Sequence, residues 1–409
     1  METRTAFDST VLDELDLADP VVHATQDLSE VWRYLRDEQP LYRHRETERG
    51  EGFWVITRRD DMATLYTDNV SFTSARGNML DTLLAKNDSA VGRMLTVTDG
   101  PEHSALRAAI GKPFSPRALT AIVDSVRSGT RKLVQEATQR AECDFAVDVA
   151  AHVPLAAICD LFVVPDEDRR HLIGLTSGTL AAADGPPTAE GMWAARNDLL
   201  LYISQQVARR RGRSGDDVLS VLIDQEVAGR RLTHEEIIFN CYSIIIGGLE
   251  TTRFAMVGGV HALAQNTDQW QLLRDGTVRT GSAVEEILRW TTPTLHSGRT
   301  ATTDLLLFDQ LIEEGDIVTM WNASANRDER AFAEPDRFVL ARDPNKHLTF
   351  AHGPHYCMGA YLARAELSAM LEALRDSVSE IRMTGPARRV YSNFLSGYST
   401  MPVQLVPAG

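Results

Sequence analysis

Residues 350–359 have the side chains and spacing of a metal-binding loop: they read Phe-Ala-His-Gly-Pro-His-Tyr-Cys-Met-Gly, and a helical pattern follows directly. Cys357 precedes the positive end of that helix dipole, which favours the thiolate over the thiol. Gly353 and Gly359 let the backbone turn its amide groups towards the sulfur, and Phe350 can shield one side. A thiolate that ligates haem iron pushes electron density onto the metal and favours O–O cleavage. The alternative is a buried, inert cysteine, but ten residues that fit together favour the ligand.

A second reactive group lies in the segment Ile246-Gly247-Gly248-Leu249-Glu250-Thr251-Thr252, inside a predicted long helix. Each glycine costs about 1 kcal/mol of helix stability relative to alanine, so two together need a reason. Without side chains, the helix can pass close over a flat macrocycle and leave room for a diatomic ligand. We expect the Thr251 hydroxyl to compete for a backbone carbonyl and open a kink or π-bulge, and the Glu250 carboxylate to relay protons. The alternative is a glycine contact between helices beside a solvated glutamate.

On these residues the chain resembles the cytochrome P450 family, the haem-thiolate monooxygenases, whose cysteine loop is usually F-G-x-G-x-H-x-C-x-G. Phe350, Gly353, His355, Cys357 and Gly359 match that pattern, while alanine stands at 351 in place of a glycine. The resemblance implies a haem b cofactor whose iron has Cys357 as its axial ligand.

The resemblance also implies roles for the distal helix and for the edge of the haem. Thr251 hydrogen-bonds dioxygen and Glu250 feeds protons, so these two are the implied catalytic residues. Gly247 and Gly248 lie against the macrocycle. Four residues match family positions that bind the haem propionates: His103, Arg107, Arg299 and His355. Solvated surface charge is the default for any one of the four, but their joint placement favours cofactor binding.

A further match concerns structure rather than catalysis. Glu286-Ile287-Leu288-Arg289 places an acid and a base on one helix face, a pair that by itself is usually a surface salt bridge. In the family, the E-x-x-R helix and the arginine of a P-x-R-F loop form a buried network behind the cysteine. By that match Glu286, Arg289 and Arg337 are structural, and breaking one leaves a buried charge that costs about 3–5 kcal/mol.

The resemblance predicts a distal substrate pocket built from stretches 76–95, 176–193, 244–248, 293–297 and 394–398. Its apolar candidates are Met79, Leu83, Leu84, Ile244, Leu295 and Phe394, and its polar candidates are Asn78, His296 and Ser297. A mixed lining suits a medium-sized, partly polar small molecule, and relatives of this type often tailor bacterial natural products. We therefore expect O₂-dependent hydroxylation or another oxidation of a peptide- or polyketide-derived compound. Two alternatives stay open: an oxidative C–C or C–N ring-coupling enzyme that inserts no oxygen, and a non-catalytic haem-based sensor of gas or ligand.

Helical periodicity dominates the elements that must position these residues. It predicts helices over 28–36, 58–66, 102–110, 116–140, 166–180, 187–210, 233–264, 282–290 and 358–377, and strands over 52–56, 301–308, 316–321 and 401–406. The fold is therefore expected to be mainly α with small β-sheets, close to the family's triangular fold, with the haem between the long distal helix and the helix after the cysteine loop. Residues 1–409 are expected to form one domain, with about the first 20 as a flexible segment.

Composition bounds the remaining classes of function. The 42 basic and 57 acidic residues give a net charge of −15, which argues against nucleic acid or an anionic membrane as a partner. No apolar run reaches the ~18 residues of a membrane span. The four cysteines show no C-x-x-C spacing, which indicates free thiols in a reducing compartment. We expect a soluble, cytoplasmic monomer.

The chain carries no phosphate-binding P-loop and no dinucleotide fingerprint. Its electrons must then come from separate proteins, for which the resemblance implies a ferredoxin and a ferredoxin reductase. A face that docks an acidic ferredoxin should be locally basic. The candidates for such a face are Lys112, Arg342, Lys346, His352 and Arg364.

Overall fold

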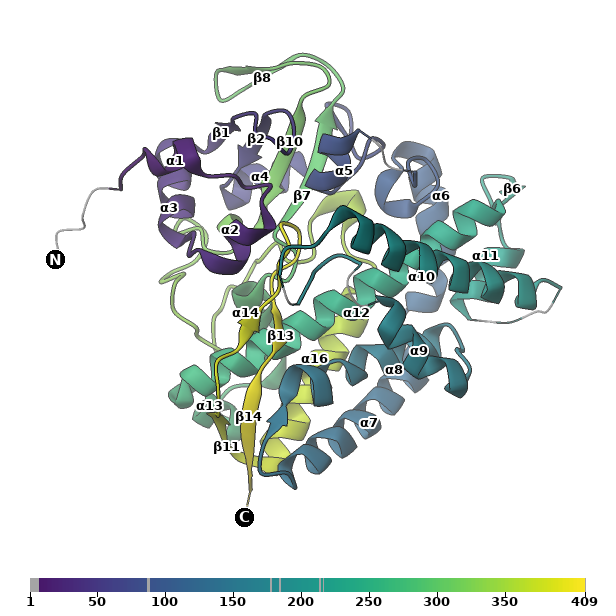
Figure 1. Cartoon of the computed structure of the whole chain (residues 1–409), viewed down its shortest axis with the longest axis vertical. Coiled ribbons are helices and arrows are strands. Elements are labelled where there is room, and N and C mark those ends of the chain that lie inside the picture. The colour runs from purple at the N-terminus through teal and green to yellow at the C-terminus, as the bar shows by residue number, and fades with distance from the viewer. Residues whose placement is uncertain are drawn as a thin grey trace.

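The computed structural model describes residues 7–86, 89–176, 179–183, 185–212, 215 and 217–408. Helices make up most of the described chain and the sheets are small, which confirms the expected mainly α class (Figure 1). Within these ranges, none of the helices combines the length and the apolar character that crossing a membrane requires.

The expected helices are present, most with ends shifted by one to four residues. The α-helices are α1 Val11–Glu14, α2 Pro20–Thr25, α3 Ser29–Glu38, α4 Arg59–Leu65, α5 Leu80–Ala85, α6 Gly100–Gly111, α7 Thr120–Thr138, α8 His152–Leu161, α9 Asp166–Thr176, α10 Ala189–Arg210, α11 Val218–Asp224, α12 His234–Gln265, α13 Thr267–Arg274, α14 Thr280–Thr291, α15 Asn322–Ala325 and α16 Ala360–Ser377. Short helical turns occur at Leu95–Val97, Lys112–Phe114, Ala146–Ala150 and Gly353–His355.

The strands form one five-stranded sheet and four smaller ones. The strands are β1 Leu41–His44, β2 Phe53–Ile56, β3 Phe72–Thr73, β4 Cys143–Asp144, β5 Glu226–Val227, β6 Arg230–Arg231, β7 His296–Ala301, β8 Leu305–Leu307, β9 Gln310–Ile312, β10 Ile317–Trp321, β11 Val378–Met383, β12 Arg388–Arg389, β13 Tyr398–Thr400 and β14 Pro402–Pro407. The large sheet has the order β1-β2-β10-β7-β3, with β2 and β10 parallel and the other neighbours antiparallel. The single strand expected over 301–308 is wrong, because β7 already ends at Ala301 and β8 starts after a turn.

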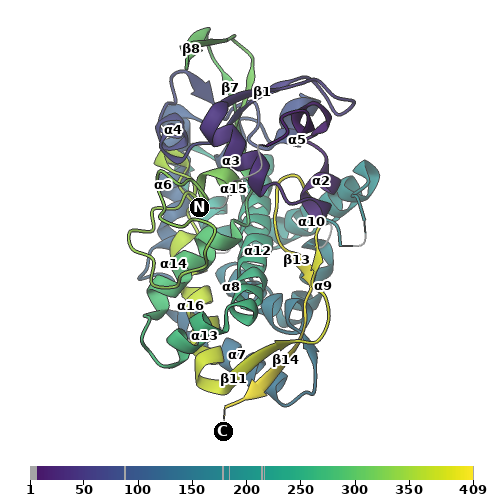
Figure 2. The ribbon, with the colours of Figure 1, turned by 90° about the vertical axis from the view of Figure 1, so that its left-hand side faces the viewer.

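The long helix α12 crosses the molecule and forms its central element (Figures 1 and 2). It begins with a capping box, in which the Thr233 hydroxyl accepts the Glu236 N–H and the Glu236 carboxylate accepts the Thr233 N–H. It contacts α8, α10, α14 and α16. At Gly259 an added Cβ would lie 2.7 Å from the Ile287 side chain, so this glycine allows α12 and α14 to pack closely.

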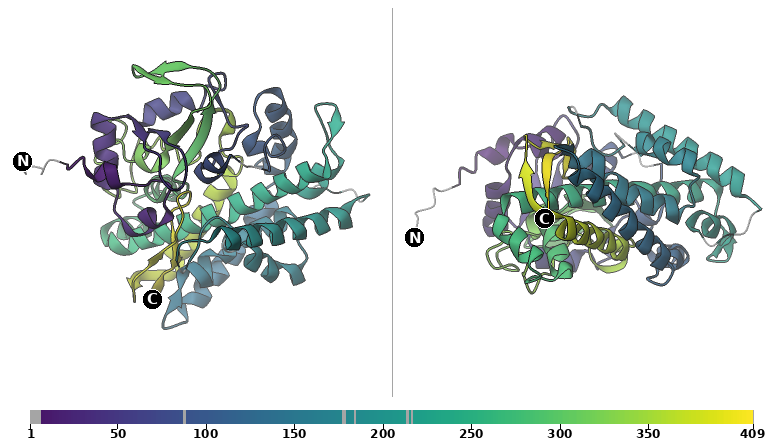
Figure 3. Two further views of the ribbon diagram at one scale, coloured as in Figure 1. Left: turned by 45° about the horizontal axis from the view of Figure 1, so that its top comes forward. Right: turned by 90° about the horizontal axis from the view of Figure 1, so that it is seen from below.

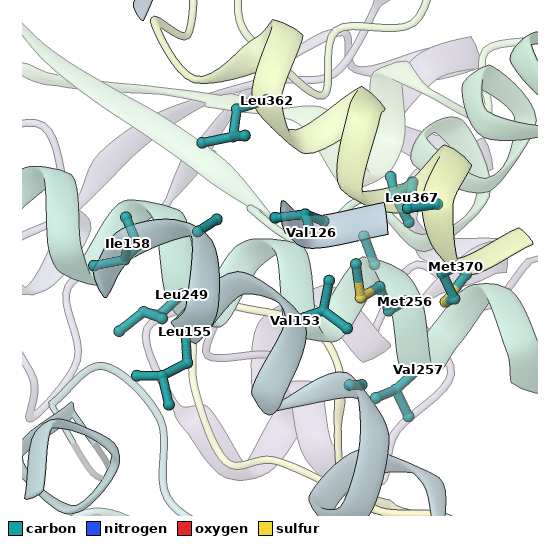
Figure 4. Packing of buried hydrophobic residues seen from close by; sticks show 14 of the residues in the cluster. Val126, Val153, Leu155, Ile158, Leu249, Met256, Val257, Leu362, Leu367 and Met370 are labelled. Atoms are coloured by element: carbon teal, nitrogen blue, oxygen red, sulfur yellow. The ribbon is translucent and has the colours of Figure 1, made fainter. Parts of the chain in front are cut away.

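The main core lies between α7, α8, α12 and α16. Figure 4 shows the apolar side chains that meet there, among them Val126, Val153, Met256 and Leu367. Burying such side chains contributes about 1.5–3 kcal/mol each. This packing fixes the distance between α12 and α16, the two helices that carry the reactive segments.

The N-terminal segment packs against the large sheet. It lies on the opposite side of the molecule from helices α10 and α11 (Figure 3). Leu12, Leu15 and Leu17 are buried, and the Leu17 N–H donates to His44 Nε2 at 3.0 Å. A flexible segment over the first 20 residues is therefore wrong for residues 11–20, because three leucines anchor them. Residues 1–6, also part of that expectation, lie outside the described residues.

Candidate active site

A cavity of about 320 Å³ lies between α12, the 350–359 loop and the start of α16. It brings together the two reactive segments found in the sequence, because Gly247, Gly248 and Thr251 line it together with Cys357. The two segments are about a hundred residues apart in the chain, so only the packing of α12 on α16 makes them one site.

The backbone of the 350–359 loop is tightly constrained. The Cys357 N–H donates to the Phe350 carbonyl at 2.9 Å, which closes the loop. Gly353 has φ +69°, and an added Cβ would lie 2.7 Å from the Tyr66 carbonyl oxygen, so this position requires glycine. Ala351, where the family pattern has glycine, also has a left-handed backbone, with φ +59°. An alanine costs roughly 1–2 kcal/mol in that conformation, so the loop is held by its surroundings rather than by local preference.

The Cys357 sulfur faces this cavity and carries no disulfide. Burial raises the pKa of the Cys357 thiol, while backbone N–H groups of Gly359 and Ala360 and the charges of Arg107 and Arg364 lower it. The amides at the helix start and the two arginines therefore oppose the cost of desolvating a thiolate at this position. The Cys357 sulfur is near two backbone amides but is largely desolvated. A thiolate in such a place is stabilised when a metal cation binds it.

The distal wall of the cavity is an uninterrupted part of α12. The Thr251 hydroxyl donates to the Gly247 carbonyl at 2.6 Å, which is the competition for a carbonyl that the sequence predicts. The helix nevertheless continues as α-helix from His234 to Gln265, so the expected π-bulge is wrong, while the expected kink stays a prediction. A Cβ added at Gly247 would meet nothing within 4 Å, whereas one at Gly248 would lie 2.8 Å from Ile158. Gly247 thus leaves space open in the cavity, and Gly248 serves mainly to pack α12 on α8.

Glu250 is next to Thr251 but is not part of the cavity lining. Its carboxylate accepts from Arg253 Nη2 at 2.9 Å, and its side chain is only 13% exposed. Burial raises the pKa of the Glu250 carboxyl, while the Arg253 charge lowers it. The structure therefore places one of the two expected catalytic residues in the cavity and the other beside it.

Glu366 is an acidic residue of the cavity that the sequence analysis missed. It lies on α16, is 3% exposed, and lines the cavity together with Thr252. Burial raises the pKa of the Glu366 carboxyl to about 8, and its hydrogen bond with Thr252 lowers it. Its position nine residues after Cys357 on a predicted helix was visible, but a glutamate on an amphipathic helix is ordinarily solvated, so no sequence signal marked it.

Replacing Glu366 with glutamine is expected to change the pH dependence of stability. Because the native carboxyl keeps its proton up to about pH 8 and the unfolded one loses it near 4.5, the native state binds more protons between these values. Stability must then fall as pH rises, by about 1.4 kcal/mol per pH unit. The Glu366→Gln holoenzyme lacks this slope. The difference in thermal midpoint, variant minus parent, should therefore increase as the pH is raised from acidic to neutral. A constant difference between the two midpoints would contradict the buried neutral carboxyl.

Three of the four expected propionate partners line the cavity. His103, Arg107 and His355 line the cavity, whereas Arg299 is buried beside it in β7. His355 Nε2 lies 2.9 Å from Asp99 Oδ1, and Asp99 also accepts from the Thr73 hydroxyl and the Ser74 N–H. Asp99 is thus a residue that orients His355, and the sequence analysis missed it.

Apart from His355, which pairs with Asp99, the expected propionate partners form no ion pair with a described carboxylate. His103 Nε2 is buried without a hydrogen-bond partner, and burial, with the charges of His355 and Arg107, lowers the pKa of His103 to about 4. Arg299 is buried, donates to the Gly298 carbonyl at 2.7 Å, and has no ion pair with a described carboxylate. Arg107 Nη2 donates to the Tyr356 carbonyl at 2.6 Å.

These observations fit a haem. The cavity offers a sulfur donor on one side, the bare backbone of Gly247 on the other, and Arg107 at its edge, with the buried and unpaired Arg299 beside it. A buried cation without a partner is costly, and the propionates of a haem would remove that cost.

Five of the nine residues expected in the substrate pocket do not line the cavity. Asn78, Ile244, Ser297 and Phe394 line it. Leu95, Leu180, Pro293 and Thr294 also line it and lie in the expected stretches without having been singled out, whereas Thr96 and Ser243 lie outside those stretches and were missed. The wrong assignments are Met79, Leu83, Leu84, Leu295 and His296. Leu83 and Leu295 pack in the core beside the large sheet, and Leu84 packs against the same core. Met79 directly precedes α5. Its neighbour Asn78 lines the cavity, but Met79 does not.

His296 shows why a polar residue in a correct stretch can still be misplaced. It is fully buried, its Nε2 accepts the Leu80 N–H at 3.1 Å, and its ring lies 4.8 Å from Trp321. Burial lowers the pKa of His296 to about 3, so this ring is neutral. In β7, side chains alternate between faces, and Ser297 rather than His296 points to the cavity.

The buried network behind the cysteine loop contains Arg342 in place of Arg337. Glu286 and Arg289 are fully buried and joined by two hydrogen bonds of 2.8 Å. Arg342 Nε donates to Glu286 Oε2 at 3.0 Å. The Arg337 side chain is 65% exposed and pairs with Glu334, and only its backbone carbonyl accepts from Arg289. The assignment of Arg337 as a network side chain is therefore wrong.

The same geometry limits the basic face expected for a ferredoxin. Arg342 is committed to Glu286, and Arg364 donates to both carboxylate oxygens of Glu285 at 2.6 and 2.9 Å. The Arg364 guanidinium also lies 4.6 Å from the centre of the Phe350 ring, next to the cysteine loop. Two of the five candidate residues thus stabilise the proximal side rather than offer free charge.

Known proteins resemble this chain over nearly its whole length. The family model described as cytochrome P450 matches residues 280–374. Cytochrome P450 NovI of Streptomyces niveus is 45% identical over 407 residues, which cover 99% of this chain and 100% of that protein. The steroid C26-monooxygenase of Mycobacterium tuberculosis (strain ATCC 25618 / H37Rv) is 32% identical over 97% of this chain and 98% of its own length.

Solved structures show the same architecture. The crystal structure of P450 OxyD, which is involved in the biosynthesis of vancomycin-type antibiotics, matches with a TM-score of 0.89 at 32% identity. The match covers 96% of this chain and 100% of that one. The similarity therefore includes the helices and sheets around the cavity as well as the cysteine loop.

Proposed function

The chain belongs to the cytochrome P450 family, so it is a haem-thiolate monooxygenase, and we propose that it oxidises a medium-sized, partly polar molecule in bacterial natural-product biosynthesis. The observation that carries this proposal is the lining of the cavity. The cavity that Cys357 lines has both neutral hydrogen-bonding side chains and apolar ones; among the neutral ones are Asn78, Thr96, Ser243, Thr294 and Ser297. Such a lining recognises hydroxyl, amide or carbonyl groups on a largely apolar molecule.

We propose that Cys357 ligates the haem iron and that His103, Arg107, Arg299 and His355 hold the propionates. When bound, the haem supplies the oxidising chemistry, in which O₂, two electrons and two protons convert a substrate C–H bond into C–OH and water. The amides of Gly359 and Ala360 support negative charge on the sulfur. The Phe350 ring, against which the Arg364 guanidinium packs, lies at the start of the cysteine loop.

Proton supply is proposed to depend on Thr251 and Glu250. The Thr251 hydroxyl uses its proton towards the Gly247 carbonyl, which leaves its oxygen lone pairs free to accept a hydrogen bond inside the cavity. Glu250 is desolvated, so it holds a proton at a higher pH than a surface glutamate does. The hydrogen bond from Arg253 to Glu250 must break before that proton can move towards Thr251. Arg253 is therefore part of the proposed path.

The substrate class rests on the lining and on one relative. OxyD is involved in the biosynthesis of vancomycin-type antibiotics, and we propose a peptide- or polyketide-derived substrate for this chain. Electrons are proposed to come from a ferredoxin and a ferredoxin reductase that approach the proximal side. Of the basic residues expected there, Arg342 and Arg364 are held in ion pairs, whereas Lys112, Lys346 and His352 form no ion pair with a described carboxylate, and these three remain candidates for docking.

The test is turnover under isotopically labelled O₂. Candidate substrates are first selected from peptide and polyketide panels by the change in haem absorbance that binding causes, and are then incubated with a ferredoxin and its reductase. Labelled oxygen in the product supports the monooxygenase. An unlabelled, newly coupled ring would establish the ring-coupling enzyme instead, and binding without any product would favour the sensor.

In the same assay, Thr251→Ala is expected to keep consuming reductant. Most of the electrons should then appear in hydrogen peroxide rather than in labelled product. Thr251→Ser keeps the hydroxyl and serves as the matched control, with coupling close to that of the parent. Positioned proton transfer contributes about 10²–10⁴-fold in general, and this range bounds the loss expected when the hydroxyl that helps to position the proton is removed. Equal coupling in the two variants would show that the hydroxyl has no part in proton supply.

A further inference from the structure

The loop before α6 forms one wall of the cavity. Leu95 and Thr96, at the start of the short turn Leu95–Val97, line the cavity on the side that faces α12. Loops of this kind are more mobile than helices unless something anchors them. The loop and α12 therefore both bound the space of the cavity.

Asn240 ties this loop to α12 through a single buried carboxamide. Its side chain is 1% exposed, and its Oδ1 accepts the Leu95 N–H at 2.9 Å. Its Nδ2 donates to the Arg93 carbonyl at 2.9 Å and to the Glu236 carbonyl at 2.7 Å. The carbonyl acceptors and the N–H donor fix which end of the carboxamide faces which group, so the loop has one register relative to the helix.

Two other polar contacts between this loop and its neighbours lie at the surface. Arg93 Nη1 and Glu235 Oε2 are 3.0 Å apart, with side chains 47% and 62% exposed. Arg196 on α10 donates to the Ser89 hydroxyl at 3.1 Å, also in an exposed position. Exposed pairs of this kind contribute little and are screened by salt. Among these ties, Asn240 makes the buried ones.

Asn240 also lies on the face of α12 that forms the cavity. Ile244 and Gly247 follow it at i+4 and i+7, and both line the cavity. The residue itself does not line the cavity, so it acts on the site through the loop that it holds.

We propose that Asn240 is a positioning residue that sets the distance between the 93–97 segment and α12, and thereby the size of molecule that the distal cavity admits. This inference rests on the proposed function, because the space that it bounds is the one assigned to the substrate. Removing the carboxamide frees the Leu95 N–H and the Arg93 carbonyl, and the wall can then move outward.

The first measurement is hydrogen exchange of the haem-loaded protein over residues 93–97. Asn240→Ala is expected to speed exchange of this segment about tenfold, the factor that corresponds to losing a buried hydrogen bond. Arg93→Ala, which removes the surface ion pair but keeps the carbonyl that Asn240 binds, is the matched control and should exchange like the parent. Asn240→Asp keeps an acceptor for Leu95 and loses both donations, so intermediate exchange is expected; it also decides the matter if the alanine variant does not fold.

The second measurement compares two nitrogen ligands of haem iron that differ in size, imidazole and clotrimazole. In Asn240→Ala the Kd for clotrimazole should fall about tenfold relative to the Kd for imidazole, whereas in Arg93→Ala the ratio should stay at the parent's value. Unchanged exchange in both Asn240 variants, or a Kd ratio that does not move, would overturn the inference. The carbon monoxide difference spectrum separates this failure from that of the proposed function: a parent without the thiolate band refutes the haem-thiolate site, while a normal band with an unmoved ratio refutes only the role of Asn240.

Discussion

Cys357→Ser is expected to fold, to bind haem weakly if at all, and to lose monooxygenase activity down to the uncatalysed background. The sulfur faces the cavity rather than the core, so the substitution removes little packing. The serine hydroxyl stays protonated at neutral pH and cannot replace a thiolate that donates electron density to iron. The reduced protein should therefore lose the red-shifted carbon monoxide band that thiolate ligation produces, and the circular dichroism spectrum should stay that of the parent.

Cys143→Ser is the matched control for this result. Cys143 is buried in β4, and burial raises the pKa of its thiol to about 11, so it is a neutral thiol away from the cavity. The variant should keep the thiolate band and the activity. Activity retained in Cys357→Ser, or the thiolate band lost in Cys143→Ser, would show that the ligand has been misassigned.

Glu286→Gln is expected to cost about 3–5 kcal/mol of unfolding free energy and to lower haem incorporation. The carboxylate is fully buried and balances both Arg289 and Arg342. It also accepts the Val339 N–H at 2.8 Å and Asn345 Nδ2 at 3.1 Å. The chain from 339 to 345 leads into the cysteine loop, so its loosening should reach Cys357. The measurements are denaturant unfolding and the ratio of haem absorbance to protein absorbance.

Two arginine variants separate the network observed in the structure from the one expected from the motif. Arg342→Ala removes a nearly buried partner of Glu286 and should lower both stability and haem content, though less than Glu286→Gln because Arg289 remains. Arg337→Ala removes a side chain whose ion pair with Glu334 is exposed, and it should match the parent in both measurements. The reverse order of the two variants would contradict the placement of Arg342.

The motif identified the buried acid and base correctly but not their third partner. Glu286 and Arg289 lie one helical turn apart, and helix geometry alone brings them together. Arg337 and Arg342 lie on irregular chain, where no period relates a residue's number to its direction. The path of residues 333–342 turns the Arg342 side chain inward and leaves that of Arg337 in solvent.

The substrate pocket divides in the same way. Ile244, expected in the pocket, and Gly247, expected against the cofactor, both line the cavity, because one face of a long helix follows from its 3.6-residue period. Met79, Leu83 and Leu84 lie on or just before the six-residue helix α5, whose orientation is set by packing against the large sheet. Their direction was not predictable from sequence.

The amino-acid sequence by itself determined the family, the cofactor chemistry and the helices that bear the reactive groups, because a tight loop and a helix encode local geometry in residue types and spacing. The tertiary structure alone decided that Glu366 shares the cavity with Cys357, that Glu250 turns to Arg253, and that Asn240 anchors the loop over the site. Such contacts join segments far apart in the chain or rotate a side chain about a helix, and they depend on which surfaces pack together rather than on any local pattern.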